Sequence, residues 1–215
     1  MRFRRRRDGQ KERGASLIEA AFVTPVFMLL IFGVFEFGFL FRNYLTLANA
    51  TTEGARTASV AGRNADADFL VLQAVNHGIS AWGLDDMEYI VIFKATDPSA
   101  AVPAGCVGPS GVSQPGVCNR YTPFHFSENY LDALAAPTEN WGCYTSGAAT
   151  APEIAGSQDS HDLDWCPQDR NAALSDPPDY IGVHIAMTHS YMTGFIGDEI
   201  ELTNTKIIRI EPERH

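Results

Sequence analysis

Glu19 is the residue with the clearest chemical potential in this 215-residue sequence, because its carboxylate stands at the start of a long apolar stretch. It follows Ala15 by four positions, and residues four apart share one face of an α-helix. Gly14 and Ala15 are small residues at the end of a basic segment, so the bond between them is a possible proteolytic cut site. Glu19 would then lie one helical turn from a new amino terminus, and it could neutralise the amine of a neighbouring chain. The alternative interpretation is a carboxylate that stays hydrated at the membrane surface.

Glu36 is the second carboxylate of interest, because every other residue between Ala20 and Phe41 is uncharged. On a continuous helix it lies about 25 Å beyond Glu19, since each residue adds about 1.5 Å. An unpaired carboxylate deep in hydrocarbon costs about 2.5–3.5 kcal/mol, so we expect Glu36 nearer the outer surface of a membrane than its centre. We predict that Glu19 and Glu36 act in subunit assembly. For Glu36, extension into the interface or protonation is the competing interpretation.

The four cysteines, Cys106, Cys118, Cys143 and Cys166, all lie well beyond the apolar stretch. An even number of cysteines outside the cytoplasm predicts two disulfides, for which three connectivities exist. We favour the sequential pairing, Cys106–Cys118 and Cys143–Cys166, because each bond would close one loop rich in Gly and Pro. Zinc binding is the alternative, although no two cysteines have the C-x₂₋₄-C spacing of a zinc site.

Other candidate sites in the sequence are weaker. The acidic segment 159–164 offers oxygen ligands for Ca²⁺ but lacks the Gly and the distal Glu of an EF-hand loop, which favours a solvated loop. His77 and His125 are scattered, and His184 and His189 would point to opposite faces of one strand, so they cannot share a metal. No G-x-S-x-G, H-E-x-x-H or phosphate-loop motif occurs. The sequence therefore predicts no enzyme, no metal and no cofactor.

The element that must position the two carboxylates is the apolar stretch from Ala20 to Phe41. Its 22 residues would rise about 33 Å as a helix, enough to cross a hydrocarbon core of about 30 Å. Residues 1–14 carry seven Lys and Arg against two acidic residues, whereas the remainder keeps nine basic and 24 acidic residues. The basic side of a membrane span stays in the cytoplasm. We therefore predict a single span with the N-terminus in the cytoplasm and the rest of the chain exported.

Two other interpretations of this stretch are weaker. A buried helix of a large soluble core rarely follows a block of arginines. The second alternative is a cleaved secretory signal peptide, for which Ala48-Asn49-Ala50 supplies an A-x-A cleavage sequence. However, signal peptides have apolar regions of about 7–15 residues, shorter than this one, and the cut would fall well past the apolar run.

The composition fits an exported globular domain, with 45% apolar residues in the chain. The net charge is −10 and the pI is about 4.9, which argues against nucleic acid as a partner, because such binders need clustered Lys and Arg on their folded part. The basic N-terminal block is interpreted as a topogenic segment beside membrane lipid. We predict membrane lipid, and no nucleic acid, among the partners.

Two helices are predicted in and after the span. The first continues the span through residues 43–60, with a domain-facing stripe and Gly62 as its stop; the stripe comprises Tyr44, Leu47 or Ala48, Thr51, Ala55 and Ala58. The second has Asp66 or Asp68 as N-cap and Gly83 just past its end, and its apolar face comprises Phe69, Leu72, Val75, Ile79 and Trp82.

Strands are predicted at residues 89–93, 180–191 and 199–210, the last two joined by a turn at 193–197. Within the loop-rich insertion 95–179 we expect only a short helix at 127–136, with the disulfides compensating for so long an irregular region. The predicted fold class is α+β: an N-terminal transmembrane helix continuing into an exported helix, then a small antiparallel-sheet domain with long disulfide-stapled loops. The predicted organisation is a basic leader (1–14), the transmembrane and extended helix (15–62) and the exported domain (63–215).

The N-terminal segment resembles the TadE-like family, the minor pilins or pseudopilins of tight-adherence (Flp) pilus systems in bacteria. The resemblance is carried by GASLIEAAFVTP at 14–25, FEFG at 35–38 and ATTEGAR at 50–56, with RIEP at 209–212 as a short C-terminal echo. No motif in the middle of the chain contributes to it.

The resemblance implies that a prepilin peptidase cuts after Gly14 and that Ala15 carries the new amino terminus. It also implies that Glu19 pairs with another pilin-like subunit. The implied function is a structural minor pilin or pilus-assembly subunit, in the cell membrane or in a surface pilus. The alternative is a membrane-anchored extracellular binding or adhesion module, with ligands met by the loops of residues 95–179.

Overall fold

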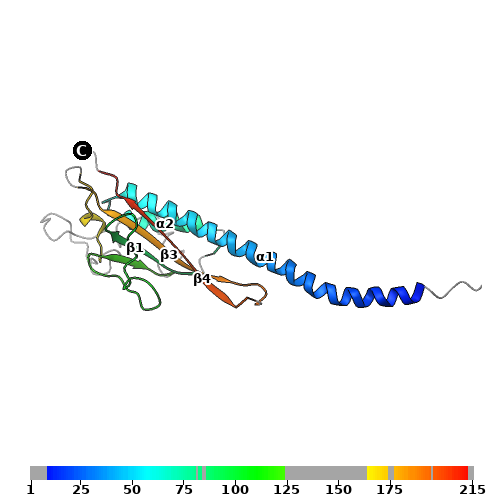
Figure 1. Cartoon of the computed structure of the whole chain (residues 1–215). Helices are drawn as coiled ribbons and strands as arrows, with labels where there is room; N and C mark the ends of the chain where they lie inside the picture. Colours follow the sequence, from blue (N-terminus) through cyan, green and yellow to red (C-terminus); the bar gives the residue numbers. More distant parts are fainter. Residues whose placement is uncertain are drawn as a thin grey trace, which may run out of the picture.

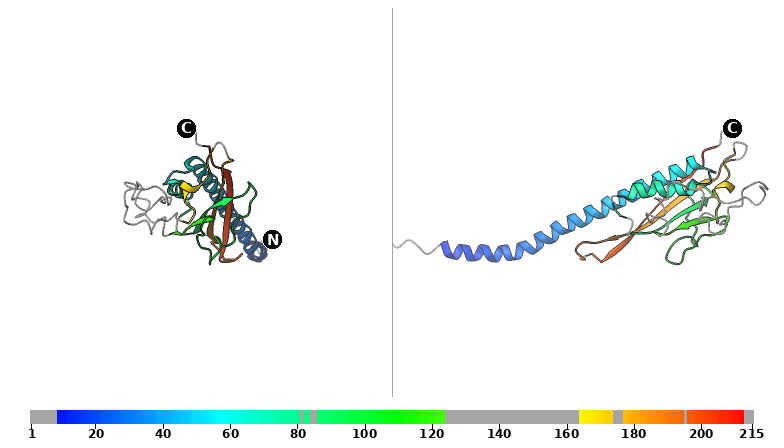
Figure 2. Two further views of the ribbon diagram at one scale, coloured as in Figure 1. Left: turned by 90° about the vertical axis from the view of Figure 1, so that its left-hand side faces the viewer. Right: turned by 180° about the vertical axis from the view of Figure 1, so that it is seen from behind.

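A long helix, α1, forms the axis of the molecule in the computed structural model (Figure 1). The structure describes residues 9–80, 82–83, 86–123, 164–173, 177–194 and 196–212, without the side chains of residues 9–13 and 15. α1 runs from Gly9 to Ala61, and its N-terminal half projects away from the other described elements (Figure 2). A second helix and a sheet pack around its C-terminal half.

α1 is continuous across the predicted boundary between the span and the exported helix, and Pro25 lies inside it. The helix ends as predicted, because Gly62 adopts φ +54° and donates its N–H to the Ala58 carbonyl at 3.1 Å. A glycine in this left-handed conformation closes many helices. At the other end α1 begins at Gly9, before the predicted start at Ala15, so the described end of the basic leader belongs to the same helix.

The stripe of α1 that faces the domain differs from the predicted one at its N-terminal end, around residues 43 and 44. Tyr44 is 44% exposed, so its predicted membership is wrong. Asn43 takes this place, because positions 43, 47 and 50 share a face at about 3.6 residues per turn. The buried members of the stripe are Leu47, Ala50, Thr51, Ala55 and Ala58.

Helix α2 (Ala67–Ile79) packs closely on α1 because both helices present small residues at their contact. A Cβ added at Gly78 would stand 2.8 Å from the Cβ of Ala50, and one added at Gly54 would stand 2.6 Å from a methyl group of Val75. Real Cβ atoms do not approach so closely, so these two glycines set the distance between the helices.

One predicted detail of α2, the position of its C-terminal end, is wrong. The helix ends at Ile79, and Trp82 belongs to the following turn, where its N–H donates to the Ile79 carbonyl at 2.8 Å. Asp66, one of the two predicted alternatives, is the N-cap residue, although its side chain makes no capping hydrogen bond. Asp68 is buried in the first turn and has other partners, described below.

Four antiparallel strands form one sheet in the order β2-β1-β3-β4. β1 (Met87–Ala95), β3 (Tyr180–Ser190) and β4 (Glu199–Arg209) confirm the three predicted strands. β2 (Cys118–Tyr121) lies within the region predicted as loop and pairs with β1, from Ile90 opposite Tyr121 to Phe93 opposite Cys118.

The end of β4 is tied back to α1. The hydroxyl of Ser59 donates to the Arg209 carbonyl at 2.7 Å, and the N–H of Glu211 donates to the Ser59 carbonyl at 3.0 Å. The last strand therefore ends beside the C-terminal end of the long helix, as Figure 1 shows.

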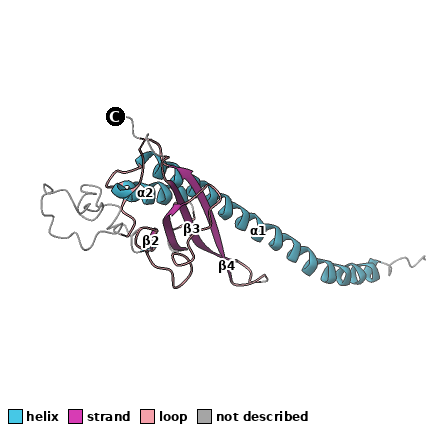
Figure 3. Ribbon diagram, turned by 60° about the vertical axis from the view of Figure 1, so that its left-hand side comes forward, coloured by secondary structure: helices cyan, strands magenta, loops and turns pink. Residues whose placement is uncertain are grey.

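The two faces of the sheet contribute to two separate cores, and the helices cover one face (Figure 3). The larger core joins Leu47, Leu72, Val75 and Ile79 of the helices to Ile90, Ile92, Val183 and Ile185 of the strands. On the opposite face, Tyr89, Val91 and Phe93 pack with Cys106 and Cys118 under the loop that follows β1. Because both faces are covered, β1 and β3 are buried along most of their length and show no regular alternation of buried and exposed residues.

The predicted disulfide between Cys106 and Cys118 is present, with Cα atoms 6.6 Å apart. Cys166 is also disulfide-bonded, whereas its predicted partner Cys143 lies outside the described residues, as does the predicted helix at 127–136. A short 3₁₀ helix, η2 (Pro167–Asp169), follows Cys166. The fold is α+β as predicted, with a long apolar helix, a small antiparallel sheet and a disulfide-closed loop.

Candidate functional site

The predicted processing residues, Gly14 and Ala15, and the predicted assembly residue Glu19 lie on the projecting half of α1. Gly14 and Glu19 are exposed, and a Cβ added at Gly14 would meet no described atom within 4 Å. The continuous helix places Glu19 one turn beyond Ala15, which is the spacing that the predicted pairing requires. The cut after Gly14 and the pairing of Glu19 stay predictions.

The surface of α1 around and beyond Glu19 is apolar and exposed. The side chains that are more than half exposed include Leu17, Ile18, Phe22, Val23, Val26, Phe27, Leu29, Leu30, Val34 and Phe35. This helix is long and apolar enough to cross a membrane. Soluble monomers rarely expose so large a continuous apolar surface, so the projecting half is consistent with membrane anchoring.

Glu36 differs from Glu19, because only 2% of its surface is exposed. Its carboxylate accepts hydrogen bonds from the N–H of Met192 at 3.1 Å, and from the N–H and hydroxyl of Thr193 at 2.5 and 2.7 Å. Met192 and Thr193 belong to the turn between β3 and β4, which reaches back along α1 (Figure 1). Instead of extending into the interface, Glu36 attaches this turn to the helix. Its role in subunit assembly stays a prediction.

A second attachment lies two helical turns further along α1. The side-chain amide of Asn43 is hydrogen-bonded to Nδ1 of His189 at 3.0 Å, and His189 is 5% exposed. The His189 ring packs edge-on against Tyr191 and Trp82, with centroids 5.3 and 6.5 Å away. We call the contacts of Glu36 and Asn43 with this part of the chain the helix–turn junction.

The helix–turn junction fixes how the domain that contains the sheet sits on α1. Two polar side chains on one face of α1 hold the end of β3 and the turn that follows it. Hydrogen bonds to a carboxylate are roughly twice as strong as those between neutral groups, so Glu36 is the stronger attachment. Its partners lie 156 and 157 residues away in sequence, and no local pattern could have identified them.

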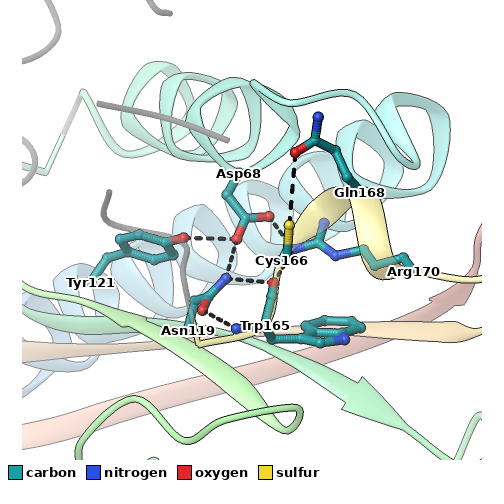
Figure 4. A network of polar contacts seen from close by, with 7 residues as sticks. All are labelled: Asp68, Asn119, Tyr121, Trp165, Cys166, Gln168 and Arg170. Carbon is teal, nitrogen blue, oxygen red and sulfur yellow. Dashed lines mark hydrogen bonds and ion pairs between the residues drawn. The ribbon is translucent and has the colours of Figure 1, made fainter. Parts of the chain in front are cut away.

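A buried polar network joins α2, β2 and the segment after residue 163 (Figure 4). The carboxylate of Asp68 accepts hydrogen bonds from the Tyr121 hydroxyl at 2.7 Å and the Asn119 amide at 2.8 Å. It also forms an ion pair with Arg170, with N and O 2.6 Å apart and both side chains completely buried. Asn119 in turn exchanges hydrogen bonds with the backbone of Trp165, at 2.7 and 2.9 Å.

Arg170 supplies the positive charge of this network. Its guanidinium lies 4.4 Å from the centre of the Trp165 ring, and its Nε and Nη1 have no hydrogen-bond partner among the described residues. The network holds the segment that contains disulfide-bonded Cys166 against α2. Because its polar groups are directed at one another, we interpret it as a structural element.

The face of the sheet that the helices do not cover carries a polar recess of about 540 Å³. Its lining comprises Glu88, Tyr89, Gly108, Pro109, Arg120, Thr188, Glu199, Ile200 and Glu201. Arg120 lies 3.8 Å from the centre of the Tyr89 ring and donates to the Cys106 carbonyl at 2.9 Å. Arg120 is therefore already engaged within its own chain.

The histidines do not gather into a site. His184 is hydrogen-bonded to the Thr205 hydroxyl at 2.7 Å, on the face opposite to His189, as predicted. Burial, with a smaller contribution from the positive charge of Arg120, lowers the pKa of His184 to about 4, so this imidazole is neutral at pH 7. His77 is exposed at the end of α2, and His125 and most of the acidic segment 159–164 lie outside the described residues. Within the described ranges, no three His, Cys, Asp or Glu side chains could hold a metal ion together.

Comparison with known proteins identifies one relationship. The family model described as TadE-like protein matches residues 14–56, as the sequence resemblance predicted. The match covers most of α1, including Glu19, Glu36 and Asn43, and none of the sheet. No curated protein and no solved structure matches the chain.

Proposed function

We propose that this chain is a structural minor pilin, or a pilus-assembly subunit, of a Tad-type (Flp) pilus system. The TadE-like match carries the proposal, because residues 14–56 contain both the candidate cut site and Glu19. The exposed apolar half of α1 supports it, since such a subunit needs one surface that can contact first lipid and then neighbouring subunits. The proposed partners are other pilin-like subunits and a prepilin peptidase, and no enzymatic activity is proposed.

The proposed topology has the N-terminus in the cytoplasm and the C-terminal domain outside the cell membrane. The excess of Lys and Arg before residue 15 supports this orientation. The disulfide between Cys106 and Cys118 supports export as well, because such bonds persist mainly in oxidising compartments.

Processing after Gly14 is the first expected result. Intact-mass measurement of the membrane-purified protein should show the loss of residues 1–14, because a small residue fits the site of a peptidase that works at the membrane surface. Gly14→Ile should retain the full-length mass, since a branched side chain would block the cut. Gly9→Ile, with the same change outside the cut site, should be processed normally. A full-length mass of the unaltered chain in cells with an active prepilin peptidase would contradict the proposal.

Glu19→Gln tests the assembly role. The amide keeps the size of the side chain but cannot neutralise an amine in a low-dielectric setting, so co-purification with partner pilins and pilus formation should be lost. Membrane insertion and the exported fold should be unchanged, because Glu19 makes no contact with the domain in the described structure. The matched control is Glu53→Gln, which alters an exposed carboxylate of the same helix whose side chain is 60% exposed. Normal assembly of Glu19→Gln would show that the charge is dispensable.

A membrane-anchored binding module is the second candidate function, and the recess beside Arg120 and Tyr89 favours it. Processing separates the two functions. A binding module works with an uncut anchor, whereas a pilin must be cut before it can leave the bilayer sideways.

A further inference from the structure

The β3–β4 turn meets α1 at the height where a membrane span would end. The sequence placed the span at Ala20–Phe41, but because Glu36 is buried against the β3–β4 turn we place it instead at Ser16–Phe35, over which α1 also rises about 30 Å, the thickness of a hydrocarbon core. Glu36 is the next residue, and its carboxylate holds the N–H groups of Met192 and Thr193. With the basic leader on the cytoplasmic side, the turn is therefore fixed at the outer boundary of the hydrocarbon.

The same turn reaches further toward the N-terminal end of α1 than any other described part of the domain (Figure 2). Although it is firmly attached through its backbone, it directs apolar side chains outward: Met192 is 74% exposed and Ile196 is 51% exposed. On the helix beside it, Phe37 and Phe41 are 61% and 62% exposed. Four large exposed apolar side chains thus belong to the turn and to the helix segment that directly follows Glu36.

We propose that Met192, Ile196, Phe37 and Phe41 form a lipid-contacting collar, which rests in the headgroup layer at the outer surface of the membrane. Each headgroup layer is about 5–7.5 Å thick, and Phe41 lies about 7.5 Å beyond Glu36 along the helix, so the collar spans this layer. Aromatic and apolar side chains favour this region of a bilayer. The inference rests on the proposed membrane topology, and it assigns the β3–β4 turn a role that the anchor helix alone does not provide.

The charges around the collar identify the lipid chemistry. The turn from residue 191 to residue 199 contains no Lys or Arg, and Asp198 and Glu199 are exposed beside Ile196. Arg42, which follows Phe41, is a single exposed basic residue and not a cluster. Attraction to anionic headgroups needs clustered basic residues, so the collar is held by burial of apolar surface alone. Contact with zwitterionic phosphatidylcholine is therefore sufficient, and anionic lipid adds nothing.

The test uses the full chain reconstituted in phosphatidylcholine vesicles that carry spin-labelled lipids as quenchers. The described cysteines are disulfide-bonded, so Met192→Cys introduces a thiol for an environment-sensitive fluorophore, and the unaltered chain measures background labelling. Shallow lipid quenchers should reduce the emission from position 192 roughly twofold more than that from Val112→Cys, a control at an exposed apolar residue of the disulfide loop. Ile196→Cys should behave like Met192→Cys.

A third label separates failure of the collar from failure of the membrane topology. Val26→Cys lies in the middle of the proposed span and should be quenched by deep lipid labels. If Val26 is quenched and Met192 is not, the collar is overturned while the anchor stands; if neither is quenched, the topology itself fails. Protection of Met192 from aqueous iodide without lipid quenching would also overturn the collar, in favour of contact with a second copy of the chain.

Discussion

Asp68→Ala should destabilise the domain that packs around α1 by about 3–5 kcal/mol, the range measured when one partner of a buried ion pair is removed. The variant leaves the fully buried Arg170 without its counter-charge and removes the acceptor of the Tyr121 hydroxyl and the Asn119 amide. The measurement is urea unfolding of the full-length chain in detergent micelles. Tryptophan fluorescence is a suitable signal, since Trp165 lies beside the network.

Asp66→Ala is the matched control for Asp68→Ala, because Asp66 precedes the same helix and its side chain makes no capping hydrogen bond. We expect it to change the free energy of unfolding by less than about 0.5 kcal/mol. The double variant Asp68→Ala/Arg170→Met should recover part of the loss, because it removes both charges. If Asp66→Ala were the more damaging single change, Asp68 would not be the centre of the network.

Glu36→Ala should release the β3–β4 turn from α1 without unfolding the sheet. It removes the acceptor of two backbone N–H groups and one hydroxyl, each bonded to a charged oxygen. Two such bonds at about 1.5 kcal/mol each give about 3 kcal/mol, or about a 100-fold increase in the exchange of the Met192 and Thr193 amides with solvent deuterium. Hydrogen exchange of the full chain in micelles measures this directly.

Two controls define the effect at Glu36. Glu36→Gln keeps an acceptor oxygen and should increase exchange far less than Glu36→Ala. Glu53→Ala removes an exposed carboxylate on the same helix, 3.9 Å from Arg56, and should leave the turn amides unchanged. Equal exchange in Glu36→Ala and the unaltered chain would show that other contacts hold the turn.

The elements that local pattern determines were predictable from the sequence. The first residues of β3 and β4 and the stop of α1 at Gly62 follow from apolar runs and from one glycine, and the structure confirms them, while both strands end one residue earlier than predicted. β2 was not predictable, because Cys118-Asn119-Arg120-Tyr121 shows neither an apolar run nor alternation. These residues form a strand because the edge of β1 is available to them and because Asn119 and Tyr121 are bonded to Asp68.

The residues of the candidate site also fall into two groups: those that the local sequence suggests, and those whose partners only the folded chain brings close. Gly14, Ala15 and Glu19 could be proposed from the sequence because their predicted roles depend on neighbours within one helical turn, and those roles stay predictions. The attachments of Glu36 and Asp68 depend on residues 51 to 157 positions away, which only the folded chain brings together. Asp68 was accordingly assigned as a possible N-cap from its local context, and Glu36 as a carboxylate directed to the interface.

The unbroken course of α1 also has a mechanical consequence. A subunit that is drawn out of a membrane bears a tensile load, and a helix without a flexible linker passes that load directly into the domain. In this chain α1 is attached to the domain at two points about 35 Å apart: Glu36 binds the β3–β4 turn, and Ser59 binds the end of β4. A force that pulls on α1 would act on the core between these two attachments. This core lies parallel to the pull and would be sheared along its whole length instead of being peeled from one end.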